Sequence, residues 1–307
     1  MDALRTPDDR FTDLPDFPWE PRYLDDLPGY EGLRLHYVDA GPPDAERVAL
    51  CLHGEPTWAF LYRKMIPVFT EAGMRVVVPD FFGFGRSDKP TDEAVYTFGF
   101  HRGMLLALLE RLDLRQITLV CQDWGGLLGL TLPMTAPKRF ERLLIMNTTL
   151  ATGRVPPGDG FLSWRDYVSR TPDLDVGRLL GRSEPSLSDA ERAAYDAPFP
   201  DARYKAGVHV FPAIVPIRRE MEGAAISAHA ADWLRNHWRG PVFLAIGEQD
   251  PVLGPPAMEA LHRLFRHAPP LMRVPDAGHF VQEHGAPIAR AALRTWGEGV
   301  RTPPLAP

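Results

Sequence analysis

One stretch near the middle of the chain decides the fold, and it reads Leu119-Val120-Cys121-Gln122-Asp123-Trp124-Gly125-Gly126. The apolar and β-branched residues 117–121 predict a buried strand, and helical spacing of apolar residues resumes after the two glycines. The turn between strand and helix is therefore only about three residues long. Such a turn crowds its neighbours, which explains the small residues at 125 and 126, and it lifts the side chain of Asp123 above the sheet edge.

Asp123 occupies the position that serine holds in the common nucleophile elbow G-x-S-x-G, and Cys121 replaces the first glycine. A carboxylate is already ionised at neutral pH, so Asp123 needs no base before it attacks. It can displace a leaving group and form an ester. The sequence therefore predicts covalent catalysis by a carboxylate.

Further buried strands are indicated along the chain at 48–52, 75–79, 143–146, 242–246 and 271–274. Strands that alternate with helical patterns predict an α/β fold, with a doubly wound, mostly parallel sheet covered on both faces. Functional loops of such folds lie at the carboxyl ends of the strands. Asp250 and His279 each follow a predicted strand, and with Asp123 they give the chain order nucleophile, acid, base of the α/β-hydrolase fold. Three coincident positions favour a catalytic triad over an ordinary loop histidine.

Strand signals disappear between Arg154 and His229, where prolines and charged residues increase. We interpret residues 154–229 as an inserted helical cap, and residues 1–153 and 230–307 as the two parts of the hydrolase core. The short helical patterns of the cap are expected to break at six of its prolines, namely Pro172, Pro185, Pro198, Pro200, Pro212 and Pro216. The three prolines within 302–307 predict a loose tail.

Composition limits the classes of function. The 307 residues are 45% hydrophobic, enough for one large α/β domain with an insertion. A net charge of -6 without a run of Lys or Arg argues against nucleic acid or a membrane surface as partner. We find no secretory signal, no long apolar run and no heptad pattern, so we expect a cytoplasmic monomer.

The two cysteines, Cys51 and Cys121, both fall in predicted buried strands. This placement is typical of reduced core thiols rather than of a disulfide or a metal pair. The sequence shows no metal-ligand spacing, and we expect neither metal nor cofactor.

Six motifs together are highly specific, and they are RTPD at 5–8, YLDDLPGY at 23–30, HGEPTW at 53–58, DFFGFG at 80–85, QDWGG at 122–126 and DAGHFVQE at 276–283. With these motifs the chain resembles the haloalkane dehalogenases of the α/β-hydrolase fold, in particular their subfamily I, over nearly its whole length. The resemblance implies detoxifying hydrolysis of short haloalkanes to a primary alcohol, a halide and a proton. Asp123 would form an alkyl-enzyme ester, and His279, oriented by Asp250, would activate the water that hydrolyses it.

A halide that leaves into an apolar pocket needs fixed hydrogen-bond donors. The indole N–H of Trp124 suits this role, since it donates, accepts nothing and sits on an apolar body. The resemblance to subfamily I implies Trp164 as the second halide donor. The backbone N–H groups of Glu55 and Trp124 would form the oxyanion hole, and the resemblance suggests that the Glu55 side chain lines the halide site or orders water. Another branch of the family has Asn in place of Glu55 and its acid after the preceding strand, where this chain has Asn147 and no carboxylate.

We expect a small apolar pocket whose wall contains Leu127, Phe161, Phe211, Pro212, Val215, Val252 and Leu253. Leu127 stands where close relatives would have Phe, and the smaller side chain would widen the pocket toward longer haloalkanes.

Two alternatives remain open. Epoxide hydrolases share the aspartate, the histidine and the cap, but they use two cap tyrosines, and this cap contains Tyr167, Tyr195 and Tyr204. The Glu55 loop and Trp164 favour a halide. A non-enzymatic relative that binds an apolar ligand or a partner protein would typically have lost a catalytic residue, whereas this chain retains all three.

Overall fold

The central feature of the fold is a twisted eight-stranded sheet. The computed structural model describes residues 1–298, in which the strand order is β10-β9-β8-β7-β4-β5-β3-β2. The strands are β2 (Arg22–Leu24), β3 (Leu35–Ala40), β4 (Val48–Leu52), β5 (Arg75–Pro79), β7 (Ile117–Gln122), β8 (Phe140–Met146), β9 (Val242–Gly247) and β10 (Met272–Val274). All neighbours from β5 to β10 run parallel, and only β3 is antiparallel to its neighbours β2 and β5. The predicted mostly parallel α/β sheet is confirmed. A separate small sheet pairs β1 (Ala3–Leu4) with β6 (Lys89–Pro90).

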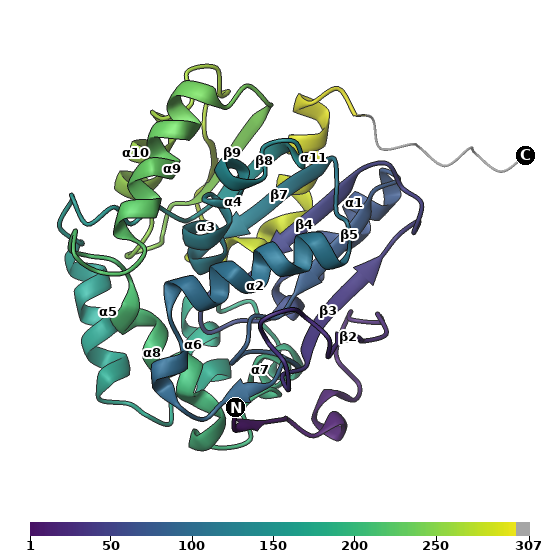
Figure 1. Cartoon of the computed structure of the whole chain (residues 1–307), viewed down its shortest axis with the longest axis vertical. Coiled ribbons are helices and arrows are strands. Elements are labelled where there is room, and N and C mark those ends of the chain that lie inside the picture. The colour runs from purple at the N-terminus through teal and green to yellow at the C-terminus, as the bar shows by residue number, and fades with distance from the viewer. Residues whose placement is uncertain (299–307) are drawn as a thin grey trace, which may run out of the picture.

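The central strands are buried along their whole length because helices cover both faces of the sheet. Every residue of β4, β7 and β9 is buried, which is why these strands read as continuous apolar runs. The core helices are α1 (Ile66–Glu71), α2 (Phe98–Arg111), α3 (Asp123–Gly129), α4 (Leu132–Thr135), α10 (Pro255–His262) and α11 (Gly285–Thr295). In Figure 1, α2 and α3 lie together on one face and α1 and α11 on the other. Cys51 and Cys121 are buried and free, as predicted.

The segment between β8 and β9 contains only helices among its regular elements. They are α5 (Asp159–Ser169), α6 (Val176–Ser183), α7 (Asp189–Asp196), α8 (Ala206–Ile214) and α9 (Ala224–His237), with a 3₁₀ turn before α8. Figure 1 shows α5 to α8 beside one end of the sheet. The predicted break at Pro212 is wrong, because α8 continues through this residue to Ile214. Pro212 lies in the last turn, where its missing N–H removes a single bond near an end at which the helix stops anyway.

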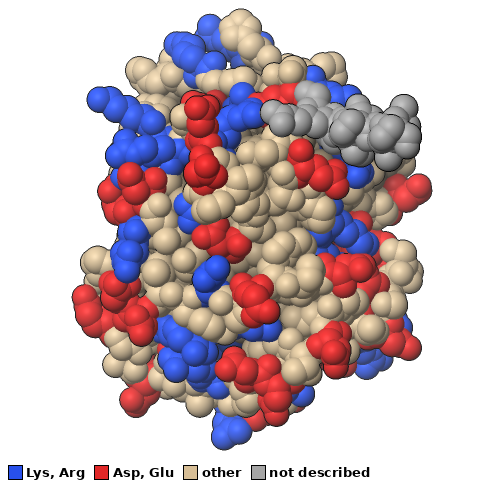
Figure 2. All heavy atoms as spheres, turned by 90° about the vertical axis from the view of Figure 1, so that its right-hand side faces the viewer, with Lys and Arg blue, Asp and Glu red and all other residues tan. Residues whose placement is uncertain are grey.

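Charged side chains of both signs are interspersed over the face shown in Figure 2, so no single sign dominates it. No helix within residues 1–298 has the length and apolarity needed to cross a membrane. The predicted loose tail, residues 302–307, lies outside the described part of the chain.

Candidate active site

The nucleophile elbow is as tight as the sequence requires. Strand β7 ends at Gln122, and α3 begins at Asp123, the next residue. The φ angle of Asp123 is 48°, in the left-handed region that residues other than glycine rarely adopt. A Cβ at Gly125 would collide with the carbonyl oxygen of Leu52 in the neighbouring strand, and only glycine avoids this collision. The strained turn therefore holds the Asp123 carboxylate above the carboxyl end of β7.

The three residues predicted to form a triad lie together at the carboxyl ends of β7, β9 and β10. The Nδ1 of His279 lies 2.8 Å from Oδ2 of Asp250, at hydrogen-bond distance. The other ring nitrogen, Nε2, lies 3.7 Å from Oδ1 of Asp123. This geometry allows an imidazole that is oriented by one carboxylate to act on chemistry at the other.

Asp250 is surrounded by donors. Its Oδ1 accepts from the backbone N–H groups of Val252 and Leu253 at 2.8 and 3.1 Å, and its Oδ2 accepts from the Asn147 amide at 2.9 Å. Burial alone would raise the pKa of Asp250, but the charge of His279 and the hydrogen bonds from His279 and Asn147 outweigh it and lower the pKa. The acid therefore stays ionised.

Asn147 and Gln122 are two polar residues whose contacts the sequence did not reveal. Asn147 also bonds the backbone of Gly247 in both directions, at 3.1 and 2.8 Å, which ties the ends of β8 and β9 together. The Gln122 amide nitrogen donates to the carbonyl oxygen of His279 at 3.0 Å and lies 3.0 Å from its Nε2. The only available signal was position, since each residue directly follows or ends a strand beside the elbow.

Electrostatics link His279 to both carboxylates. Burial lowers the pKa of His279, but the charge and hydrogen bond of Asp250 and then the charge of Asp123 outweigh it and raise the pKa to about 9. Burial raises the pKa of Asp123, while His279 and the backbone N–H groups of Trp124 and Glu55 oppose the increase. The imidazole thus has its highest proton affinity while both carboxylates are charged.

The two predicted oxyanion donors lie against the nucleophile. The backbone N–H of Glu55 donates to Oδ2 of Asp123 at 2.9 Å, and the backbone N–H of Trp124 acts with it to lower the pKa of this carboxylate. The Glu55 side chain is buried, and its Oε1 has no hydrogen-bond partner within residues 1–298. Burial, followed by the charge of Asp123, raises the pKa of Glu55 well above its usual value, and the nearby Trp164 opposes the increase only in part.

A cavity of about 420 Å³ opens onto Asp123 and His279. Its wall includes both tryptophans predicted to bind halide, Trp124 and Trp164. Six of the seven residues predicted for the wall line it, and they are Leu127, Phe161, Pro212, Val215, Val252 and Leu253. The prediction is wrong for Phe211, which is fully buried behind the wall with its ring centroid 4.6 Å from that of Trp124.

The wall also contains residues that sequence analysis did not assign to it. They are Pro56, Thr149, Gly160, Ser163, Tyr167, Leu179, Arg182, Ser183, Pro251 and Phe280. Of the three tyrosines predicted to lie in a cap, only Tyr167 lines this cavity, and Tyr195 is fully buried elsewhere. Within residues 1–298, no group of three or more His, Cys, Asp or Glu is arranged to hold a metal ion.

Comparison with known proteins places the chain in a family. Residues 48–286 match the family model described as alpha/beta hydrolase fold. The haloalkane dehalogenase of Psychrobacter cryohalolentis is 42% identical and that of Mycobacterium marinum 40%, each across 96% of this chain and 98% and 100% of the relative. The solved structure of haloalkane dehalogenase DpaA from Paraglaciecola agarilytica, described as tetrameric, is 48% identical with a TM-score of 0.94, covering 96% of this chain and 99% of that one.

The chain belongs to the haloalkane dehalogenases, which are hydrolases that act on carbon–halide bonds. The resemblance noted in the sequence is confirmed at the level of the family.

Proposed function

We propose that this protein hydrolyses short haloalkanes to a primary alcohol, a halide and a proton, through a covalent ester on Asp123. One observation carries the proposal: a carboxylate on a strained elbow lies 3.7 Å from an imidazole that is held by a second carboxylate, at one end of a cavity. Haloalkane and water are the only reactants that this chemistry requires.

The first step is displacement of the halide. Oδ2 of Asp123 is engaged by the Glu55 N–H, so Oδ1 is the oxygen that attacks the carbon in line with the carbon–halogen bond. The new C–O bond forms as the C–halogen bond breaks, and the halide takes the bonding electron pair. The indole N–H groups of Trp124 and Trp164 supply the donors for the developing charge, since both residues line the cavity.

The second step is hydrolysis of the ester. His279 removes a proton from water, and the resulting hydroxide attacks Cγ of Asp123. The negative charge then falls on the oxygen that faces the backbone N–H groups of Glu55 and Trp124, which form the oxyanion hole. Collapse of this intermediate breaks the bond to the alkyl oxygen and returns the carboxylate, the alcohol and one proton.

The same site residues also support a subfamily and a cap. Trp164 in the cavity wall and Asp250 after β9 support subfamily I. We infer that residues 154–229 form the cap over this cavity, because α5, α6 and α8 all contribute wall residues. A cytoplasmic location stays a prediction, as does a monomeric state, which the tetrameric description of DpaA makes worth measuring by size-exclusion chromatography.

The test is halide release by the purified protein, without added metal or cofactor, from short terminal bromo- and chloroalkanes, with an epoxide in parallel. We expect bromide and the matching alcohol in equal amounts, and no halide from the Asp123→Ala variant. Diol from the epoxide without halide from any haloalkane would overturn the proposal and reassign the site to epoxide hydrolysis.

A further inference from the structure

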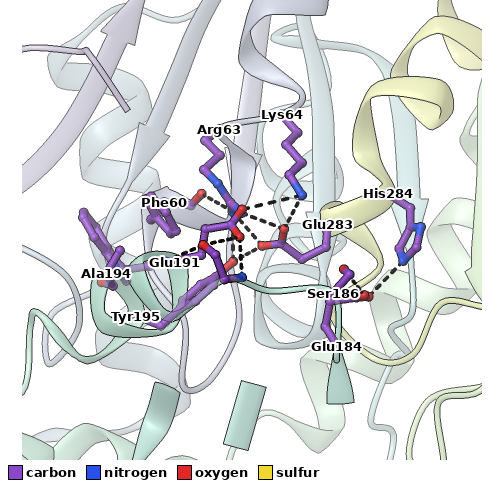
Figure 3. A network of polar contacts seen from close by, with 12 residues as sticks. Phe60, Arg63, Lys64, Glu184, Ser186, Glu191, Ala194, Tyr195, Glu283 and His284 are labelled. Carbon is purple, nitrogen blue, oxygen red and sulfur yellow. Dashed lines mark hydrogen bonds and ion pairs between the residues drawn. The ribbon is translucent and has the colours of Figure 1, made fainter. Parts of the chain in front are cut away.

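A buried ionic network lies next to the active site and plays no part in the two steps above (Figure 3). At its centre is Arg63, which follows the 3₁₀ turn η2 (Ala59–Tyr62) and has a fully buried side chain. Its Nη1 and Nη2 donate to the two carboxylate oxygens of Glu283 at 2.6 and 2.8 Å, and Nη2 also donates to Glu191 at 2.5 Å. Planar guanidinium and carboxylate groups paired in this way are geometrically specific.

The network joins the core to the cap. Glu191 and Tyr195 belong to the cap helix α7, one turn apart, and the Tyr195 hydroxyl donates to Glu283. Lys64 supplies a second cation, with Nζ 2.8 Å from Glu283. Two cations therefore face two carboxylates.

Both carboxylates of the network remain ionised near neutral pH. Burial would raise the pKa of Glu191, but bonds from Ser188 and Arg63 lower it to about 2. For Glu283, burial is likewise outweighed by Arg63 and Lys64, and the pKa is lowered. The network is therefore a permanent connection and not a pH switch in that range.

Glu283 connects this network to the catalytic base. It lies in the 3₁₀ turn η5 (Val281–His284), which begins two residues after His279. The residues on either side of Glu283 are also anchored: Gln282 donates to Gln122 at 3.3 Å, and Nε2 of His284 lies 2.9 Å from Glu184 at the end of α6. Three consecutive residues thus fix η5 to the nucleophile strand, to α7 through Arg63, and to α6.

We propose that Glu191 and Tyr195 of α7 are positioning residues for His279, and that they act through Arg63 and Glu283. The inference rests on the proposed function above. Burying charges gains little stability compared with apolar packing of the same volume, so a buried network is better explained by the geometry that it fixes. Ester hydrolysis needs such geometry, because a displacement of about 1 Å at a catalytic group can cost roughly a hundredfold in rate.

The proposal predicts that the two chemical steps respond differently. Attack by Asp123 depends on the elbow between β7 and α3, and within residues 1–298 none of Arg63, Glu191, Tyr195 and Glu283 makes a hydrogen bond to that elbow. Hydrolysis depends on His279, whose loop continues into η5. Loosening α7 from Glu283 should therefore slow the second step and leave the first unchanged, so that the alkyl-enzyme ester accumulates.

The experiment compares Glu191→Gln and Tyr195→Phe with Asp189→Asn, a control in the first turn of the same helix whose side chain is exposed. Rapid mixing with a bromoalkane, followed by acid quench and intact-mass analysis, gives the rates of ester formation and ester hydrolysis separately. We expect both network variants to hydrolyse the ester roughly tenfold more slowly and to form it within about twofold of the parent rate. Asp189→Asn should leave both rates within about twofold of the parent.

The outcomes separate this inference from the proposed function. Equal slowing of both steps in a folded variant would mean that α7 acts on the whole site. Unchanged ester hydrolysis in folded Tyr195→Phe would mean that Tyr195 does not act on His279. Either result overturns the inference. Tyr195→Phe removes a single oxygen, so it keeps the test available if Glu191→Gln does not fold. Absence of any ester in the parent protein would instead refute the nucleophilic role of Asp123.

Discussion

Replacing Asp123 with Asn should lower the pKa of His279. The amide has nearly the shape of the carboxylate but no charge, so it imitates the electrostatic change that occurs when Asp123 becomes an ester. Asp250 remains and continues to hold Nδ1 at 2.8 Å. The variant therefore isolates the contribution of one carboxylate to the proton affinity of the base.

The expected size of this change follows from the distance between the charges. His279 Nε2 and Asp123 Oδ1 are 3.7 Å apart. With an effective dielectric constant of about 20, their attraction is about 4.5 kcal/mol, which corresponds to about 3 pKa units. Both side chains retain some solvent exposure, which screens the interaction, so we expect the pKa of His279 to decrease from about 9 by about 1 to 3 units.

Nuclear magnetic resonance of ¹⁵N-labelled histidine measures this pKa directly. The His279→Gln variant assigns the signal, and intact-mass analysis verifies that the new Asn has not been hydrolysed to Asp. A pKa that is the same in Asp123→Asn and in the parent would refute the reasoning, because it would mean that the two side chains are too far apart or too well screened to interact. A decrease would explain how one histidine serves the reaction: it loses its proton more readily once the ester has formed.

Three further substitutions test separate parts of the site. His279→Gln should stop the reaction at the alkyl-enzyme ester, visible as a mass increase of the intact protein after substrate addition; full turnover would assign the base elsewhere. Trp164→Phe keeps an aromatic side chain but removes the indole N–H donor, and it should raise the activation free energy of halide release by about 2–4 kcal/mol; an unchanged rate would exclude Trp164 from the halide site. Leu127→Phe should narrow the cavity and reduce kcat/KM for long relative to short bromoalkanes by about tenfold; a constant ratio would show that Leu127 does not limit chain length.

The buried strands were predictable from sequence because helices cover both of their faces. Strands β4 and β5 have the predicted bounds. Strand β3 was not predicted, because His36 and Asp39 interrupt its apolar residues. The His36 side chain is tolerated in the core since its Nδ1 lies 2.6 Å from the buried Asp80 carboxylate, a partner 44 positions away that no local pattern reveals.

The candidate active site also has features that the sequence predicts and features that it does not. That Asp123, Asp250 and His279 lie close together could be predicted from the sequence, because each follows a strand and strand ends of a parallel sheet meet at one edge. The roles of Gln122 and Asn147 depend on which side chains face them, and this is set only by the folded chain. Phe211 shows why the sequence does not determine which residues form a pocket wall. Neighbouring positions of α8 point about 100° apart, and the cavity contacts Pro212 instead of Phe211.

Glu55 lies beside Asp123 in the cavity wall, and its charge state would affect the binding of a halide in this cavity. Burial and the nearby charge of Asp123 raise the pKa of Glu55 well above its usual value, and both causes favour the neutral carboxyl. An ionised Glu55 would repel a halide held by Trp124 and Trp164 as we propose, whereas a protonated one would not.

The isosteric variant Glu55→Gln distinguishes the two states. If Glu55 is already neutral, bromide should bind the variant and the parent with dissociation constants within about threefold of each other at pH 7. Because both tryptophans line the cavity, quenching of tryptophan fluorescence by bromide reports binding. A variant that binds bromide tenfold or more tightly, equivalent to at least about 1.4 kcal/mol, would show that the parent carries a repelling charge at Glu55 and that burial does not hold its proton.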